Sequence, residues 1–508
     1  MLTIFLVSIR KGFPHMNLTD ERLRQLDNPS LTDSERVLLR CRLAAEFIHI
    51  GQYQAAREAL GELWRGAGVR PNIEGLEKKV AAEVLLQCGA LSGWIGSSMP
   101  TKGVQENAKD LISESISIFE SIGASVRAAL ARSDLALCYW REGAYDEARI
   151  ILGKAVDALT ETDTEQKATI LLRCVTVECA AGKYNAALDI LKDAARLLNE
   201  SRNDVLKGSL HNLYAVTLQR MGSLEGHTDY YDQAIIEYTA AVHHYKQARH
   251  ERFAAIIENN LALVLYRVKR YEEAHKYLDR AERALQKLND DGLLAEVNET
   301  RARVYLAEQK YREANRAIAR AIQTFEKGSE PTVLTDAFVA QGIAWARLGV
   351  FDSSIGILRR AVSIAEEAGA HTNAALAALT LIEEHGAKRL AETEAYNLYL
   401  NADSLLKETQ NAEIMARLRA CARIIILRRS RLWMGEGFTL PDALLDYEAQ
   451  FIEQALEGEH GIVSRAARRL GINYQTLINI LNTRHQNLLT KRTPPKKRGR
   501  RIIKKAKD

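Results

Sequence analysis

Apolar and small residues recur along most of the chain at the three- and four-residue spacing of an amphipathic helix. In the stretch NNLALVLYRVKRYEEAHKYLDRAERAL, Leu261 and Leu265 fall on one face of a first helix, and Leu278 falls on one face of a second helix. The composition agrees with this pattern, because Ala, Leu, Glu and Arg dominate while only eight Pro and ten Phe occur in 508 residues. The sequence therefore predicts an all-α protein.

The helix pattern repeats with a period of about forty residues. An aromatic residue is followed three positions later by a small residue at seven places, and the last six are spaced by 39, 47, 40, 40 and 40 residues: Tyr53, Tyr145, Tyr184, Tyr231, Tyr271, Tyr311 and Phe351. A weaker unit with Ala108 and Ile112 lies between the first two. We expect some nine helix pairs over residues 34–410, with the segment GSLEGHTD inserting about seven residues into one turn.

Small residues at Ala262, Ala274 and Ala281 would let neighbouring helices approach closely, and other units have alanine at the same places. This pattern resembles the tetratricopeptide repeat family. The resemblance implies a right-handed α-solenoid that binds a protein or peptide segment on a concave face built from the first helix of each pair. The candidate groove residues, each of which also fits an ordinary solvated surface position, are Asn212, Asn259, Asn260, Glu299 and Arg303.

A second domain is expected over residues 441–486, after a capping helix and a Gly- and Pro-containing linker at 411–440. Gly471 supplies a turn between two short helices, Ala467 is small where they would cross, and the side chain of Asn473 can cap the second helix. Ser464 is well placed near the start of the first short helix. The longer preceding helix has apolar residues at helical spacing, namely Leu444, Tyr447, Phe451, Ile452 and Leu456.

The segment AARRLGI, followed by the polar NYQTL, completes a helix-turn-helix pattern that resembles the Fis-type domain of bacterial enhancer-binding activators. The resemblance implies binding to double-stranded DNA. Gln475 and Asn479 can each offer a donor and an acceptor to an adenine edge, whereas Tyr474 and Thr476 suit a phosphate or a thymine methyl group. The full set of candidate DNA-binding residues is Ser464, Arg465, Arg468, Asn473, Tyr474, Gln475, Thr476, Asn479, Asn482, Arg484 and His485.

The net charge of +5 is unevenly distributed. Residues 491–508 carry ten Lys or Arg against one Asp, a net +9, which leaves 5 − 9 = −4 for the rest of the chain. We expect residues 487–508 to be a disordered basic tail that lies along the duplex and strengthens non-specific affinity. The alternative is a solubilising end.

Signatures of catalysis are absent from the sequence. It contains no GxxxxGK[ST], HExxH, GxSxG or kinase signature set, so we expect no enzyme and no cofactor. The six cysteines form no CxxC pair, which disfavours a disulfide framework or a metal site and favours reduced thiols in a cytoplasmic protein. In the N-terminal segment, 1–33, an apolar run precedes Arg10 and Lys11, which is neither signal-like nor long enough to span a membrane. Residues 1–15 are therefore expected to reflect a misassigned start, with Met16 as the first residue.

Together these features predict a sequence-specific transcriptional regulator whose solenoid receives a protein or peptide signal. Helix-turn-helix domains generally read two half-sites, so a homodimer is expected. The alternative is a non-enzymatic interaction scaffold whose C-terminal helices only dimerise and whose basic tail binds acidic partners or RNA. An enzyme with an unrecognised site is disfavoured because the motifs are missing.

Overall fold

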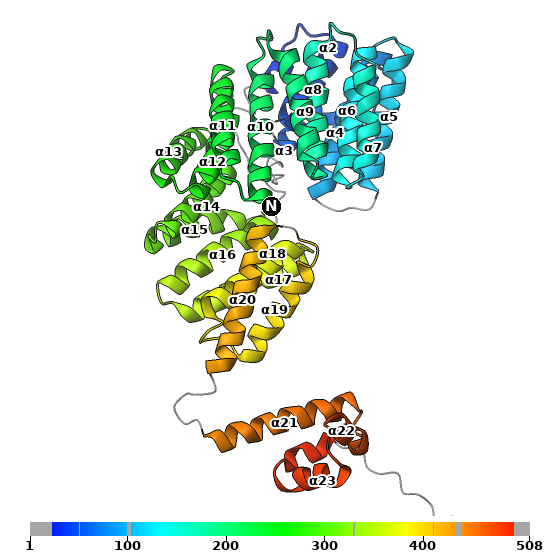
Figure 1. Ribbon diagram of the computed structural model, residues 1–508. Helices are drawn as coiled ribbons and strands as arrows, with labels where there is room; N and C mark the ends of the chain where they lie inside the picture. Colours follow the sequence, from blue (N-terminus) through cyan, green and yellow to red (C-terminus); the bar gives the residue numbers. More distant parts are fainter. Residues whose placement is uncertain are drawn as a thin grey trace, which may run out of the picture. The chain divides into compact units, whose positions relative to one another are not determined.

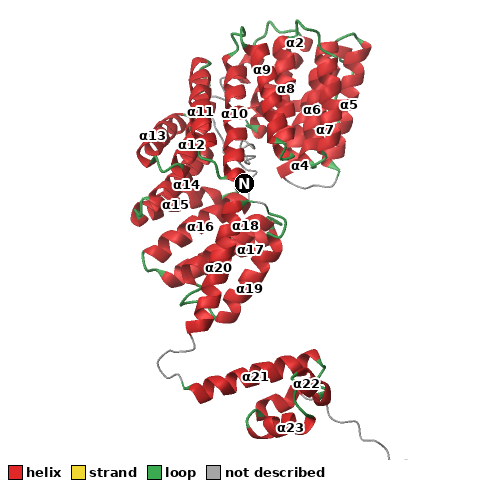
Figure 2. Ribbon diagram, in the orientation of Figure 1, coloured by secondary structure: helices red, strands yellow, loops and turns green. Residues whose placement is uncertain are grey.

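A computed structural model describes residues 23–49, 51–98, 103–328, 331–409, 411–431 and 439–491. The chain divides into two compact units, Met1–Ala422 and Arg423–Asp508 (Figure 1). Every regular element in the described part of the chain is a helix, as Figure 2 shows. The prediction of an all-α protein is confirmed. The expected misassigned start over residues 1–15 lies outside the described residues.

The first unit stacks nine helix pairs over its described residues, as the forty-residue period predicted. In six pairs the recurring aromatic residue is the first residue of the second helix. The pairs are α2 (Asp33–His49) with α3 (Tyr53–Leu60), α4 (Lys78–Ser98) with α5 (Val104–Ser121), α6 (Ser125–Arg141) with α7 (Tyr145–Asp157), α8 (Thr164–Ala180) with α9 (Tyr184–Leu198), α10 (Asp204–Glu225) with α11 (Asp229–Gln247), α12 (Glu251–Arg267) with α13 (Tyr271–Lys287), α14 (Asp291–Ala307) with α15 (Tyr311–Phe325), α16 (Pro331–Arg347) with α17 (Phe351–Glu367), and α18 (His371–His385) with α19 (Glu392–Leu405).

Alanine and glycine permit the close crossings inside this array. Ala262, Ala274 and Ala281 are fully buried in one continuous core that joins several pairs. At Gly342 on α16 a Cβ atom would lie 2.5 Å from the side chain of Leu358 on α17, so only glycine fits there. Larger residues at such positions would push the helices apart.

Tight turns between the helices depend on a single left-handed residue. After α12, Lys269 has φ +63°, and the N–H of Arg270 donates to the carbonyl of Leu265 over 2.8 Å. This geometry closes the end of the helix with a six-residue hydrogen-bonded loop. Glycine takes the left-handed position in other turns of the array, at Gly123, Gly143, Gly182, Gly349 and Gly369.

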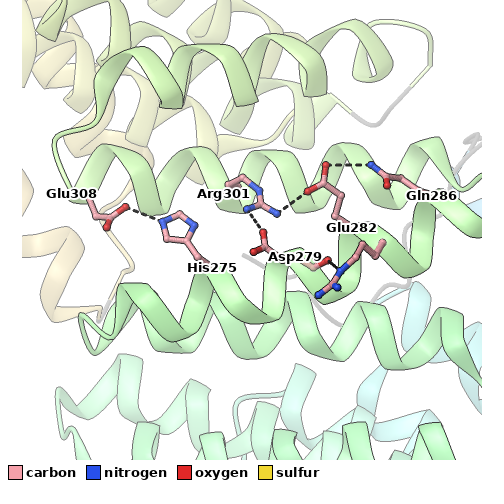
Figure 3. Close-up of polar contacts among 7 residues, drawn as sticks. His275, Asp279, Glu282, Gln286, Arg301 and Glu308 are labelled. Atoms are coloured by element: carbon pink, nitrogen blue, oxygen red, sulfur yellow. Dashed lines mark hydrogen bonds and ion pairs between the residues drawn. The ribbon is translucent and has the colours of Figure 1, made fainter.

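Polar contacts fix successive pairs against each other (Figure 3). Between α13 and α14, Arg301 donates from Nη1 to Asp279 Oδ1 over 2.7 Å and from Nη2 to Glu282 Oε2 over 2.9 Å. At the other end of the same interface, His275 Nε2 lies 2.8 Å from Glu308 Oε2. These side chains come from the second helix of one pair and the first helix of the next, so they fix the stacking of neighbouring repeats.

The insertion before Tyr231 is mostly helical, whereas the sequence analysis placed it in a turn. α10 runs for 22 residues, to Glu225, and only a short loop with Gly226 at φ +73° separates it from α11. At Gly222, a Cβ atom would lie 3.2 Å from the ring of Tyr231. The missing side chain lets the extended end of α10 pack closely on α11, so the extra residues lengthen the helix.

Helix α20 (Ala412–Arg431) follows the ninth pair. Arg417 donates to Glu383 on α18 over 2.9 Å and 2.7 Å, and Cys421 is fully buried against the carbonyl of Leu379. At its start, Glu413 lies 3.5 Å from Arg267 on α12. Arg417 and Cys421 therefore pack α20 on the last pair of the array, whereas the start of α20 contacts α12, three pairs earlier. Of the expected linker, residues 432–438 lie outside the described residues.

Two of the expected boundaries need correction. Before α2, the short helix η1 (Arg24–Asp27) carries Leu26, which is 9% exposed and packs in the core of the first pair, so residues 23–33 belong with the array. At the other end, the expected tail begins too early. Residues Gln486–Lys491 form the helix η4, and Leu488 is buried in the core of the second unit. Residues 492–508 lie outside the described residues.

Candidate nucleic-acid interface and repeat groove

The second unit contains the helix-turn-helix that the sequence predicted. Its described elements are α21 (Leu440–Gly458), α22 (Val463–Arg469), α23 (Tyr474–Thr483) and η4. Gly471 has φ +71° in the turn between α22 and α23, and the side chain of Asn473 accepts a hydrogen bond from the backbone N–H of Thr476 over 2.8 Å. Glycine therefore allows the turn, and asparagine caps the helix that follows.

A single apolar core fixes α23 relative to the other helices. Ala466 and Ala467 are buried on α22, in agreement with a close crossing at this point. Leu477 and Leu481 are fully buried on α23, while Ile478 and Ile480 are partly buried. The remaining buried members of this core are Ile452, Ala455, Leu456, Val463 and Leu488. Because α23 is short, these contacts supply most of its stability and set which face it exposes.

The outer face of α23 carries a polar stripe. Gln475, Asn479 and Asn482 are all exposed and are spaced by four and three residues, which places them in one line along the helix. Tyr474 is 51% exposed at the start of the helix, and Thr476 is exposed with its hydroxyl donating to Asn473. The residues chosen for base contact are therefore brought together on one accessible face.

Three further candidates lie on α22. Ser464, Arg465 and Arg468 are exposed. Ser464 lies near the start of α22, as expected, but the N-cap residue is Ile462 and no side chain caps the helix. Ser464 lies one residue inside the helix, where its exposed hydroxyl is available to an outside group.

Arg484 and His485 differ from the other candidates, since both face Glu448 on α21. His485 is only 5% exposed, and its Nε2 atom lies 3.0 Å from Glu448 Oε2. Arg484 remains exposed but donates to the same carboxylate over 3.1 Å and 3.2 Å. The burial of His485 removes it from the side chains that can reach a phosphate. No pattern in the sequence signals this contact, because the two partners are 37 residues apart.

The apolar stripe of α21 is only partly used by the core. Ile452 and Leu456 are buried, as expected, but Leu444 is 59% exposed, Tyr447 39% and Phe451 57%. The rings of Tyr447 and Phe451 lie 6.2 Å apart on the same side of the helix. All five residues lie on α21 as expected, but only two of them face the domain core. The other three define an exposed apolar face on α21.

In the first unit, partly exposed residues of α12 fall on one face of that helix, at Arg252, Ile256, Asn259, Leu263 and Arg267. Such a stripe on a first helix is what a groove would present. The array also curves strongly, since the rings of His49 at the end of α2 and Phe253 at the start of α12 lie 5.4 Å apart. We refer to the surface made by this stripe and its equivalents on the other first helices as the repeat groove.

The amide side chains differ in how available they are. The Oδ1 atoms of Asn212 on α10 and Asn259 on α12 are buried and have no hydrogen-bond partner among the described residues. Buried polar atoms are normally paired, so both positions lack an expected donor. Asn260, by contrast, is only 9% exposed. Its side chain lies mostly within the helix packing, so it is a poor groove residue.

Glu299 and Arg303 bind each other on α14, and Arg303 also donates to Asp336 on α16 over 3.2 Å. Asn373 on α18 donates to the other oxygen of Asp336 over 2.9 Å. Burial raises the pKa of Glu299, although Arg303 opposes this effect. The sequence analysis missed Asp336 and Asn373. The period would have found Asp336, because it lies 336 − 256 = 80 residues, or two repeats, after the groove residue Ile256.

Among the residues that the structure describes, no three His, Cys, Asp or Glu side chains lie close enough together to hold a metal ion. No described helix is both long and apolar enough to cross a membrane.

Comparisons with known families agree with this architecture. Residues 253–327 match the family model of the tetratricopeptide repeat, and residues 444–479 match that of the bacterial regulatory protein, Fis family. The chain thus combines a tetratricopeptide repeat array with a C-terminal Fis-type helix-turn-helix, the organisation of a DNA-binding regulator with a repeat sensor. No curated protein matches the chain.

Several solved structures resemble the fold. The apo form of the quorum sensor NprR from B. thuringiensis is 16% identical over 68% of this chain and 92% of its own, with a TM-score of 0.46. The signal transduction ATPase PH0952 from Pyrococcus horikoshii, which has a tetratricopeptide repeat sensor, is 11% identical over 81% of this chain and 66% of its own, with a TM-score of 0.49. A Rap protein complexed with competence and sporulation factor is 13% identical over 78% of this chain and 99% of its own, with a TM-score of 0.43. At these identities the likeness concerns the fold alone.

Proposed function

We propose that this protein is a sequence-specific transcriptional regulator that reads DNA with α23. The observation that supports this most is the exposed polar stripe of Gln475, Asn479 and Asn482 on the second helix of a Fis-type helix-turn-helix. The major groove admits an α-helix, and Gln and Asn side chains pair with the N6 and N7 atoms of adenine. Gln475 and Asn479 read bases in this proposal, and Asn482 extends the contact.

The neighbouring side chains would hold the DNA backbone. Ser464, Arg465 and Arg468 are exposed on α22, and Tyr474 and Thr476 are exposed at the start of α23. Backbone contacts set the register of a protein on the duplex without reading its sequence. Arg484 is a weaker candidate because it is already paired with Glu448. A protein that regulates genes in this way acts where the DNA is, which for a bacterium is the cytoplasm.

The exposed apolar face of α21 supports a homodimer. Leu444, Tyr447 and Phe451 together form an exposed apolar surface on α21, and a second copy of the same face would cover it. A two-fold dimer would present two copies of α23 to half-sites one helical turn apart, about 34–36 Å. The proposed target is therefore an inverted repeat.

The repeat groove would receive the input. Asn212 and Asn259 each have a buried Oδ1 atom without a partner in the described part of the chain, and an extended peptide has a backbone N–H at every residue except proline to donate to such acceptors. The groove is also lined by charged side chains, including Glu299 and Arg303. We propose a peptide or an extended protein segment as the ligand, bound without catalysis.

Selection from a random duplex pool tests the DNA-binding proposal. The full chain is incubated with random duplexes, and the retained DNA is sequenced through several rounds. We expect one enriched inverted repeat. Retention of duplexes without any enriched sequence would favour the alternative scaffold, in which the basic tail binds nucleic acid without reading it.

Removal of residues 492–508 distinguishes the contribution of the tail to DNA binding from that of α23. The tail carries nine Lys and Arg residues. If about half of them meet phosphates, truncation flattens the slope of log K against log salt by roughly 4 units, at about 0.9 per phosphate. The selected sequence should be unchanged. Equal slopes for the two proteins would show that the tail does not contact the duplex.

A further inference from the structure

The repeat groove contains an arginine that no acidic side chain of the described residues neutralises. Tyr145 and Tyr271 are equivalent aromatics in two repeats, and 271 − 145 = 126. Because 267 − 141 is also 126, Arg141 at the end of α6 takes the groove position that Arg267 takes on α12. Arg141 thus belongs to the same groove face as Asn259. Its helix, α6, lies four repeats before α14, which carries the acidic groove residues.

Arg141 is half-buried and forms no ion pair with any described residue. Its guanidinium lies over the ring of Trp94, 3.8 Å from the ring centroid, and Nη1 lies 3.7 Å from the sulfur of Cys138. Its Nε atom is buried without an acceptor among the described residues. The nearest acidic residue on the same helix face, Asp134, is 2.8 Å from Arg173 and is committed to it. Burial lowers the pKa of Arg141, and Cys138, Tyr53 and Asp134 oppose this effect only in part.

Buried charges in proteins are paired, because removal of an ion from water is expensive unless an opposite charge compensates it. The contact with the Trp94 ring compensates only part of that cost. Arg141 therefore lacks an anion, and the geometry of a planar guanidinium suits a carboxylate. A carboxylate from outside the chain would complete this site.

Negative charge exceeds positive charge further along the groove, on α14 and α16. Glu299 and Asp336 share the guanidinium of Arg303. Asp336 lies two repeats beyond Ile256. Glu296 lies one repeat beyond Ile256, so the three residues occupy equivalent positions on α12, α14 and α16. Glu299, Asp336 and Arg303 together give a net charge of −1, so this part of the groove favours a cation.

The two amide oxygens of Asn212 and Asn259 lie between these charged regions in the order of the array. Arg141 is on α6, Asn212 on α10, Asn259 on α12 and Glu299 on α14. A single linear ligand can therefore contact all of them in sequence.

We infer that the groove selects a linear peptide with a carboxylate at one end, bound by Arg141, and a cationic side chain at the other end, bound by Glu299 and Asp336. This inference rests on the proposed peptide-binding function and adds its charge pattern. Because the array curves, the four steps from α6 to α14 cover at most roughly 32–40 Å, at a spacing of about 8–10 Å between helices. An extended chain of about ten residues covers that distance.

A synthetic library of random twelve-residue peptides tests this inference. Half of the library has free carboxyl termini and half is amidated. The full chain is the bait, and the retained peptides are identified by mass spectrometry. We expect retained peptides to have an acidic group at one end and Lys or Arg at the other. A strong preference for the unamidated half would identify the terminal carboxylate as the anion, and equal retention would identify an Asp or Glu side chain.

Substitutions that reverse or remove a charge in the groove test which residues bind each end of the peptide. Arg141→Glu should lower the retention of acid-bearing peptides at least tenfold, and Glu299→Gln combined with Asp336→Asn should relax the requirement for a cation. Arg312→Glu, at an exposed position on α15, is the matched control and should leave the peptide profile unchanged. Thermal melting verifies that each variant is folded. Identical profiles for wild type and Arg141→Glu would overturn the inference while the peptide function stands. Retention of no peptide at all would remove the proposed function itself.

Discussion

The repeat array and the C-terminal domain use the same device, a helix crossing at alanine, but they differ in how much structure supports it. Ala262 on α12 belongs to a core that runs through several pairs, and α12 contacts helices of its own and neighbouring pairs. Ala467 on α22 belongs to a core of nine buried residues contributed by only four elements, α21, α22, α23 and η4. In an array the stability of a unit is shared with its neighbours, whereas the small domain has only its own contacts.

The repeat array and the C-terminal domain also differ in how much apolar surface they expose. On the array the most exposed large apolar residue is Ile236, 67% exposed on α11, and it belongs to no exposed apolar stripe on that helix. On α21, Leu444, Tyr447 and Phe451 are exposed together at helical spacing. Isolated apolar residues on a surface are ordinary, but a continuous stripe marks an interaction site. In the proposed dimer, the small domain buries against a partner the apolar surface that a long array buries between its own repeats.

The largest expected effect comes from placing a charge on this stripe. Phe451→Asp should convert the protein from a dimer to a monomer while leaving it folded, because Phe451 is 57% exposed. Loss of the second DNA contact would lower affinity for an inverted repeat by about 10²- to 10⁴-fold. Mass photometry measures the oligomeric state, and mobility shift measures the affinity. Ile236→Asp is the matched control, and an equal mass for wild type and Phe451→Asp would refute the dimer interface.

A smaller effect is expected from overpacking the two alanine crossings. Ala467→Leu and Ala262→Leu should each cost about 1–3 kcal/mol. Hydrogen exchange resolved by peptide mass can follow both regions in the intact chain. We expect the first change to accelerate exchange throughout residues 440–491 and the second to affect mainly α12, α13 and α14. Unaltered exchange at α22 and α23 in Ala467→Leu would show that the helices do not cross at this residue.

Left-handed turn residues give the smallest effect. Gly471 has φ +71° and Lys269 has φ +63°. Gly471→Ala should destabilise the C-terminal domain by about 1–2 kcal/mol, because an L-residue is strained in this region. Lys269→Gly should relieve that strain and stabilise the array by less than about 1 kcal/mol, since glycine loses more backbone entropy on folding. Urea unfolding measures both changes, and shifts of the same sign would contradict this explanation.

The sequence predicts local features well because they depend on residues close together in the chain. The aromatic residues mark helix starts, and Asn473 and Gly471 cap and turn the chain where their chemistry allows. The forty-residue period extends this local information over the whole array. The same period locates the groove positions, because Arg141 and Asp336 are found by moving a whole number of repeats along the chain from α12.

Features that depend on distant residues are predicted poorly. The sequence assigns His485 to DNA, but Glu448 from α21 holds it inside the domain. It assigns Leu488 and Lys491 to the tail, but Leu488 fills the core, and Lys491 lies 2.5 Å from Glu457 on α21. These ion pairs bridge 34 to 37 residues, and periodicity within one helix contains no information about them. The exposed face of α21 could not be predicted either, because apolar residues at helical spacing have the same pattern whether they face a core or a partner.

The ratio of affinities for the selected inverted repeat and a scrambled duplex tests the central claim, that α23 reads base sequence. Gln475→Ala and Asn479→Ala should each lower this ratio by about 1–3 kcal/mol in free energy while non-specific affinity stays nearly unchanged. Gln233→Ala, at an exposed position on α11 of the repeat array, is the matched control and should keep the wild-type ratio. An equal ratio for wild type and both α23 variants, with all proteins folded, would contradict the placement of α23 in the major groove.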